Sequence, residues 1–184
     1  LGGNVACNAG GLHCVKYGVT RDYVLSLAGY LPTGEFVRWG RATRKFATGY
    51  NLRDLWIGSE GTLGVVTEIT VRVILAVPNR VTFLGVFCDD QTALNTPLAL
   101  SKLGVLPSII EYMDQWTIDC LQKYVGFEVF SGIEPKPMVL IELDGTAESV
   151  VQESSLVENW LKDQSLSFRK ADTEEEAEKL WAVR

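Results

Sequence analysis

Apolar and polar positions alternate in two different ways along the chain. Up to residue 77 the apolar runs are short and separated by glycine-rich turns, which is typical of short strands. After Pro78, patterns of strand length alternate with patterns of helix length. The expected strands are 24–31, 36–39, 65–75, 81–87, 109–113, 138–143 and 166–170, and the expected helical segments are 51–56, 90–103, 114–124, 146–162 and 173–183.

Capping residues mark the ends of two of these helices. Asp89 or Asp90 is the expected N-cap of helix 90–103, and Gly104 occupies its C-terminal cap position. Thr173 and Glu176 have the spacing of a capping box at the start of the last helix.

This order of elements predicts an α+β fold in two parts. The alternating second part indicates a ferredoxin-like βαββαβ sandwich, with an open antiparallel sheet and helices on one face. The change of pattern at Pro78 predicts two domains, 1–77 and 78–184, that are joined near residues 77–80 and do not share a sheet.

Composition and charge exclude several classes of protein. Hydrophobic residues make up 47% of the chain and charged residues 22%, which is enough for a packed core. The net charge is -6 and no segment carries a basic stripe, so nucleic acid is not the expected partner. No apolar run reaches the roughly 18 residues that would indicate a transmembrane segment.

Cysteine and histidine are sparse, and their spacing indicates no metal site. The four cysteines, at positions 7, 14, 88 and 120, include no CxxC pair, and His13 is the single histidine. We expect reduced cysteines and a cytoplasmic protein, peripheral to the inner membrane at most. Both ends of the chain fall inside expected elements, so we expect these residues to be a piece of a longer protein.

Two glycine-rich segments are candidates for ligand binding. Residues 2–11 combine glycine, alanine and asparagine, so the backbone there can approach a flat or anionic ligand closely. The alternative is a tight packing turn between strands. Residues 58–67 have a similar composition just before a strand, but they match neither the GxGxxG fingerprint nor a Walker A loop.

Together with residues 16–22 and 40–52, these segments resemble one family in order and spacing. The family is the FAD-linked oxidases of the vanillyl-alcohol oxidase (PCMH-type) superfamily, on the branch of the glycolate oxidase FAD subunit, D-lactate dehydrogenase and D-2-hydroxyglutarate dehydrogenase. The resemblance continues through 107–114, 141–145 and the Leu-Trp-Ala-Val-Arg sequence at 180–184. It implies that residues 1–77 are the second half of a PCMH-type FAD-binding domain and 78–184 the first part of the substrate (cap) domain.

The resemblance also implies FAD as the cofactor and assigns residues to it. Gly3 and the run Cys7, Asn8, Ala9 and Gly10 are expected to line the flavin and pyrophosphate through their backbone. The adenosine half is expected to be wrapped by the second segment, namely by Glu60, Gly61, Thr62, Leu63, Gly64, Val65 and Val66.

Arg184 matches the family arginine that faces the substrate carboxylate. A guanidinium binds a carboxylate through two parallel hydrogen bonds and keeps its charge. The alternative is a solvated cation at a helix C-terminus. Arg44 and Lys45 are expected at the surface, and Tyr17, Tyr50 and Trp56 in the core.

The activity implied by the resemblance is oxidation of a D-2-hydroxy acid, such as glycolate or D-lactate, to the 2-oxo acid. Electrons would pass from the flavin to a non-NAD acceptor, either an iron–sulfur protein or an electron-transfer flavoprotein. The family's first pyrophosphate loop and its histidine-rich element fall outside these residues, so residues 1–184 alone are expected to hold FAD weakly. A non-catalytic FAD-binding subunit and a flavin oxidase of another alcohol remain open as alternatives.

Overall fold

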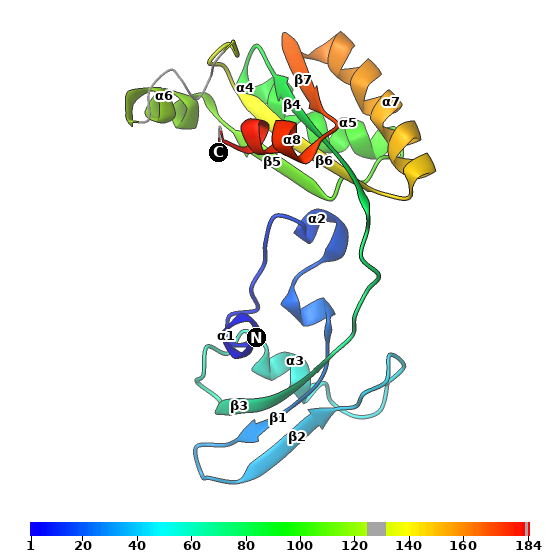
Figure 1. Ribbon diagram of the computed structural model, residues 1–184. Coiled ribbons are helices and arrows are strands. Elements are labelled where there is room, and N and C mark those ends of the chain that lie inside the picture. Colours follow the sequence, from blue (N-terminus) through cyan, green and yellow to red (C-terminus); the bar gives the residue numbers. More distant parts are fainter. Residues whose placement is uncertain (125–131, 183) are drawn as a thin grey trace. The chain divides into compact units, whose positions relative to one another are not determined.

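The computed structural model describes residues 1–124, 132–182 and 184, which form two compact units, Leu1–Leu75 and Ala76–Arg184 (Figure 1). Each unit has its own antiparallel sheet. None of the described helices combines the length and apolar character that a membrane crossing requires.

The first unit is a three-stranded sheet in the order β2-β1-β3. Its strands are β1 (Val24–Tyr30), β2 (Phe36–Gly40) and β3 (Val65–Val71), and its short helices are α1 (Gly2–Ala6), α2 (Cys14–Tyr17), the 3-10 helix η1 (Thr20–Asp22) and α3 (Leu52–Trp56). α1 and α3 supply Val5 and Trp56 to one core with Val24 and Leu27 of the sheet. The packing against α1 and α3 therefore holds the two glycine-rich segments near one face of this sheet.

The expected strand at 65–75 is wrong at its C-terminal end. β1 begins at Val24, which pairs with Val71. The Arg72 N–H still donates to the Tyr23 carbonyl at 2.8 Å, but no strand of the described residues pairs with positions 73–75. Val73 and Leu75 are accordingly 87% and 92% exposed. Apolar and β-branched residues at these positions continue the sequence pattern of a strand, but a strand also needs a neighbour for its backbone hydrogen bonds.

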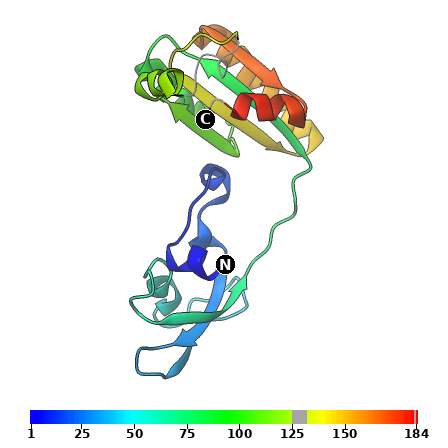
Figure 2. The ribbon, with the colours of Figure 1, turned by 60° about the vertical axis from the view of Figure 1, so that its left-hand side comes forward.

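The second unit is a four-stranded antiparallel sheet in the order β5-β6-β4-β7, which confirms the ferredoxin-like prediction (Figures 1 and 2). Its strands are β4 (Asn79–Val86), β5 (Ile109–Met113), β6 (Met138–Gly145) and β7 (Ser167–Ala171). Its helices are α4 (Asp90–Leu94), α5 (Thr96–Lys102), α6 (Gln115–Tyr124), α7 (Ala147–Gln164) and α8 (Glu174–Trp181).

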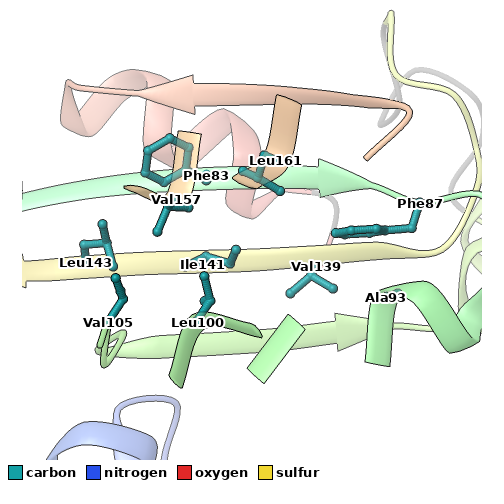
Figure 3. Close-up of a cluster of buried hydrophobic side chains, with 10 residues drawn as sticks. All are labelled: Phe83, Phe87, Ala93, Leu100, Val105, Val139, Ile141, Leu143, Val157 and Leu161. Carbon is teal, nitrogen blue, oxygen red and sulfur yellow. The ribbon is translucent and has the colours of Figure 1, made fainter. Parts of the chain in front are cut away.

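Helices cover both faces of this sheet, so the expectation of helices on one face is wrong. Phe83 and Ile141 pack with Leu100 of α5 and with Leu161 of α7 (Figure 3). The opposite face buries a second cluster, to which α6 contributes Ile118 and α8 contributes Leu180. β6 is buried from Met138 through Asp144, as a central strand with two covered faces must be.

The single helix expected at 90–103 is two helices, α4 and α5, that meet at Asn95. Pro97 lies in the first turn of α5, where its missing N–H is tolerated, and it cannot continue α4. Asp89 is the N-cap of α4 and accepts from the Thr92 N–H at 2.8 Å; this bond and that from the Cys88 thiol hold the pKa of Asp89 below its usual value. The capping box of Thr173 and Glu176 is confirmed.

Candidate functional site

The two glycine-rich segments lie side by side in the first unit. The Gly58 N–H donates to the Val5 carbonyl at 3.0 Å, and the Glu60 N–H donates to the Ala6 carbonyl at 2.9 Å. Asn8 and Glu60 have φ values of 48° and 51°, in the left-handed region that non-glycine residues seldom adopt. The fold therefore brings two segments about fifty residues apart into one surface with an unusual backbone conformation.

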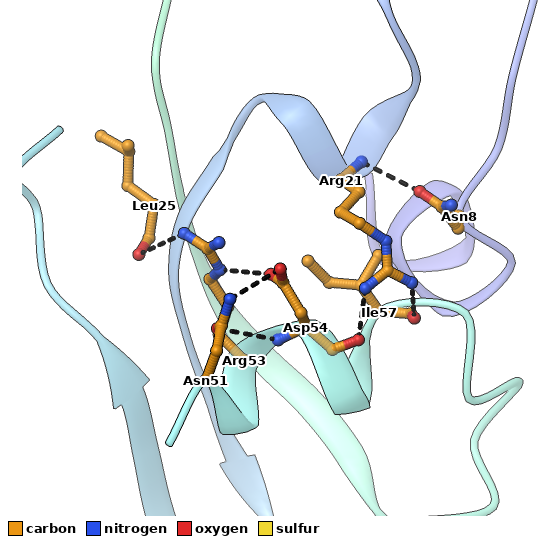
Figure 4. A network of polar contacts seen from close by, with 7 residues as sticks. All are labelled: Asn8, Arg21, Leu25, Asn51, Arg53, Asp54 and Ile57. Carbon is orange, nitrogen blue, oxygen red and sulfur yellow. Dashed lines mark hydrogen bonds and ion pairs between the residues drawn. The ribbon is translucent and has the colours of Figure 1, made fainter. Parts of the chain in front are cut away.

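Arg21 makes hydrogen bonds to the segments on both sides of this surface (Figure 4). Its backbone N–H donates to Asn8 Oδ1 at 2.9 Å. Its guanidinium donates to the carbonyl of Asp54 through Nη1 at 2.5 Å and to the carbonyl of Ile57 through Nη2 at 2.7 Å. Arg21 thus connects the loop after α1, through its backbone, with the end of α3, through its side chain. Our sequence interpretation gave Arg21 no role, because its acceptors are backbone carbonyls that leave no signal in residue types.

Thr20, which precedes Arg21, also binds the loop after α1. Thr20 donates to the Ala9 carbonyl through both its N–H, at 3.1 Å, and its Oγ1, at 2.8 Å. The predicted residues Asn8 and Ala9 are therefore held by η1 as well as by α1, whose Val5 and Asn4 carbonyls accept from the Asn8 and Ala9 N–H groups.

The glycines of the predicted site fall into two groups. No atom lies within 4 Å of the position that a Cβ would take on Gly3 or Gly61, so the backbone there is open. A Cβ on Gly10 would lie 3.3 Å from Cys14 Sγ, and one on Gly64 would collide with the Tyr30 carbonyl and the Trp56 ring. Gly3 and Gly61 therefore fit a group laid against the main chain, whereas Gly64 is required by packing and Gly10 is closely packed.

The side chains of the second glycine-rich segment also differ in how far they are buried. Leu63 and Val66 pack against the core of the first unit, so they can offer a ligand only their main chain. Val65 is 67% exposed, and the Thr62 hydroxyl donates to the Ser59 carbonyl at 2.6 Å. Cys7 is an exposed free thiol.

A cavity of about 350 Å³ lies beside the first segment. Its lining includes Asn4, Ala9, Gly11 and His13. The Nδ1 atom of His13 is buried and has no hydrogen-bond partner in the part of the chain that the structure describes.

The environments of the remaining predicted residues are mixed. Arg44 and Lys45 are exposed and Trp56 is in the core, as predicted. Tyr50 is 92% exposed, so its assignment to the core is wrong. It lies outside any strand or helix in the segment before α3, where no element packs over it.

Arg184 belongs to the second unit and is not simply a solvated cation. Its Nε donates to Glu111 Oε2 of β5 at 3.1 Å, and its backbone N–H donates to the Trp181 carbonyl at 3.1 Å. Sequence reasoning did not identify Glu111, which is 73 positions away in the chain.

A polar cavity of about 600 Å³ lies on the α8 side of the second sheet. Thr82 and Glu142, which are paired across β4 and β6, line it together with Arg80 and Trp181. Thr82 and Glu142 are both buried, and Glu142 accepts a hydrogen bond from the Ser108 hydroxyl at 3.4 Å through Oε1. The alternation in Ile141-Glu142-Leu143 is the one sequence signal that could have indicated a carboxylate facing this side.

Comparison with known proteins agrees with this arrangement. Residues 77–184 match the family described as FAD linked oxidases, C-terminal domain. The whole chain is 35% identical to a D-lactate dehydrogenase of Anaerostipes hadrus, of which it covers 40%. Over 96% of the chain it is 36% identical to the glycolate oxidase subunit GlcD of Bacillus subtilis, of which it covers 37%.

Solved structures show the same fold. An alkyldihydroxyacetonephosphate synthase matches 99% of the chain with a TM-score of 0.70 at 21% identity, over 36% of its own length. A p-cresol methylhydroxylase matches 91% of the chain with a TM-score of 0.64 at 16% identity, over 38% of its own length. The chain thus spans well under half the length of the proteins that it matches.

Proposed function

The chain belongs to the FAD-linked oxidases, and from this premise we propose that the whole protein oxidises a D-2-hydroxy acid, such as glycolate or D-lactate, to the 2-oxo acid. The observation that carries the proposal is the similarity of nearly the entire chain to a D-lactate dehydrogenase and to a glycolate oxidase subunit. The alternatives, a non-catalytic subunit or an oxidase of another alcohol, have no comparable support.

We assign residues 1–77 to the FAD-binding domain and propose that FAD lies against the two adjacent glycine-rich segments. Support comes from the open backbone at Gly3 and Gly61, where an approaching ligand meets no side chain. Cys7, Asn8, Ala9 and Gly10 would contribute main-chain contacts to the flavin and pyrophosphate, and residues 60–66 to the adenosine half. When bound, the flavin supplies the two-electron acceptor that the oxidation requires.

We assign residues 78–184 to the substrate domain, with Arg184 as the ligand of the substrate carboxylate. Support comes from its guanidinium, whose Nη atoms are unused within the described residues 1–124, 132–182 and 184. A carboxylate can therefore accept two parallel hydrogen bonds from it. We further propose that electrons leave to an iron–sulfur protein or an electron-transfer flavoprotein.

Substrate-dependent reduction of an acceptor dye by the purified full-length protein tests this function. We expect D-lactate or glycolate to support dye reduction, L-lactate to be a poor substrate, and NAD⁺ to be inert as the acceptor. Activity on phenols or sugar lactones, with none on 2-hydroxy acids, would refute the proposal.

A glycine pair separates flavin binding from folding. Gly3→Ala should not lower the stability of the first unit, because the added Cβ meets nothing and alanine favours the helix α1. It should lower the affinity of the full-length protein for FAD, measured by flavin fluorescence after dilution. Gly64→Ala is the matched control, since it should destabilise the unit itself through collision with the Tyr30 carbonyl. Equal FAD affinity of Gly3→Ala and wild type would remove Gly3 from the proposed site.

A further inference from the structure

Glu111 stands on the mostly apolar face of the second sheet. Cross-strand pairing sets it opposite Leu140, while Met113 on the same strand lies opposite Met138. Leu140, Met113 and Met138 all belong to the buried cluster beneath α6 and α8. A carboxylate that is only 27% exposed on such a face requires a compensating partner, and Arg184 provides it.

The backbone of Arg184 is held in position from the other side. Leu180 is buried in the same cluster, and Trp181 packs against it. The hydrogen bond from the Arg184 N–H to the Trp181 carbonyl then ties the backbone of Arg184 to the end of α8. The side chain of Arg184 therefore starts from an anchored position, and Glu111 determines where its guanidinium is held.

The way in which the guanidinium is bonded distinguishes Arg184 from the structural arginine of the first unit. Arg21 donates from both Nη1 and Nη2 to backbone carbonyls, so both of its Nη atoms already serve the fold. Arg184 bonds to Glu111 through Nε, and the described part of the chain offers no partner to its two Nη atoms. These two atoms form the edge of the Arg184 guanidinium that stays open for a carboxylate to bind with two parallel bonds.

We propose that Glu111 is a positioning residue, which holds the Arg184 guanidinium so that its two Nη atoms face the carboxylate of the substrate. This inference rests on the role proposed for Arg184. Arginine has a long and flexible side chain, so fixing it before the substrate arrives removes an entropic cost of binding.

Glu111 also has an opposing effect, because its negative charge repels the carboxylate of the substrate. The two side chains are 45% and 27% exposed, so solvent and salt screen this repulsion. We therefore expect Glu111 to favour substrate binding more by positioning Arg184 than it opposes binding by charge repulsion. A raised KM on removal of Glu111 indicates that positioning is the larger effect, and a lowered KM indicates that repulsion is.

Steady-state kinetics of the full-length protein with D-lactate, or with glycolate if D-lactate is not oxidised, test the proposal. Glu111→Ala should raise KM about ten-fold, equivalent to ~1.4 kcal/mol, with little change in kcat or flavin content. Glu111→Gln keeps an acceptor for Nε and should raise KM by a smaller factor. Glu175→Ala is the matched control, because it removes an exposed ion pair with Lys179 (2.9 Å) from α8 without touching Arg184.

A double-mutant cycle distinguishes positioning from a general structural effect. If Glu111 acts through Arg184, Glu111→Ala should add little to the KM of an Arg184→Lys variant, whereas independent effects would multiply. Multiplied effects, an unchanged KM in both Glu111 variants, or a lowered KM would overturn the proposal. If Arg184→Lys itself leaves KM unchanged, the role proposed for Arg184 fails, and the positioning role fails with it.

Discussion

Replacing Arg184 with lysine is expected to raise the KM for a small 2-hydroxy acid by about ten- to a hundred-fold in the full-length protein. Lysine keeps the charge but cannot supply two parallel donors, and a charge-assisted pair contributes about 1.5–3 kcal/mol. At about 1.4 kcal/mol per factor of ten, this loss gives the stated range. Flavin occupancy, measured from the visible absorption of the purified protein, should not change.

Arg38→Lys is the control for the Arg184 experiment. Arg38 also pairs with a carboxylate, that of Glu68 at 2.5 Å, but it lies on an exposed strand of the first unit. Its replacement should leave KM and kcat at their wild-type values. If Arg184→Lys behaved in the same way, Arg184 would be only a surface cation at the end of α8.

Replacing Arg21 with leucine is expected to destabilise the first unit by about 3 kcal/mol. The guanidinium makes two short hydrogen bonds to the carbonyls of Asp54 and Ile57, and bonds to charged groups contribute about 1.5–3 kcal/mol each. Leucine would leave both carbonyls without this donor and would loosen the contact between η1 and the end of α3. Urea unfolding followed by tryptophan fluorescence measures the change, with Trp39 and Trp56 as reporters in this unit.

Flavin binding should weaken together with stability in this variant, because the guanidinium holds η1 against the end of α3, and the Arg21 N–H of η1 in turn holds Asn8. Arg38→Leu is the matched control, since its exposed ion pair should contribute less than about 1 kcal/mol. A loss of stability below that value for Arg21→Leu would show that α3 and η1 hold together without the guanidinium.

The sequence predicted the elements of the second unit well because local signals agree with tertiary packing there. β5 begins and ends where the pattern of residues 109–113 predicts, and α8 begins after the capping box at Thr173. Such agreement arises where one side chain serves both the local structure and the core.

Predictions failed where the structure depends on distant partners. The strand expected at 65–75 stops at Val71 because β1 offers no further residues to pair with. The second covered face of the sheet was missed, although the continuous apolar run from Met138 to Ile141 is typical of a strand that is buried on both sides.

The sequence identified the two glycine-rich segments of the candidate site, but it did not show which of their residues are open to a ligand. Glycine content indicated where the backbone can be approached, yet only the neighbours in space distinguish open Gly3 from packed Gly64. The partners of Arg21 and Arg184 are distant in the chain, at 36 and 73 positions for Ile57 and Glu111, so no local pattern could identify them.

A single anaerobic turnover tests the central claim most directly. Full-length protein with bound FAD is mixed with one equivalent of D-lactate or glycolate, and flavin absorption and the 2-oxo acid are measured together. We predict loss of the oxidised flavin spectrum with one 2-oxo acid formed per flavin, and slower reduction of the flavin when the hydrogen at C2 is replaced by deuterium. A flavin that stays oxidised with every D-2-hydroxy acid tried, in protein that is folded and saturated with FAD, would contradict it.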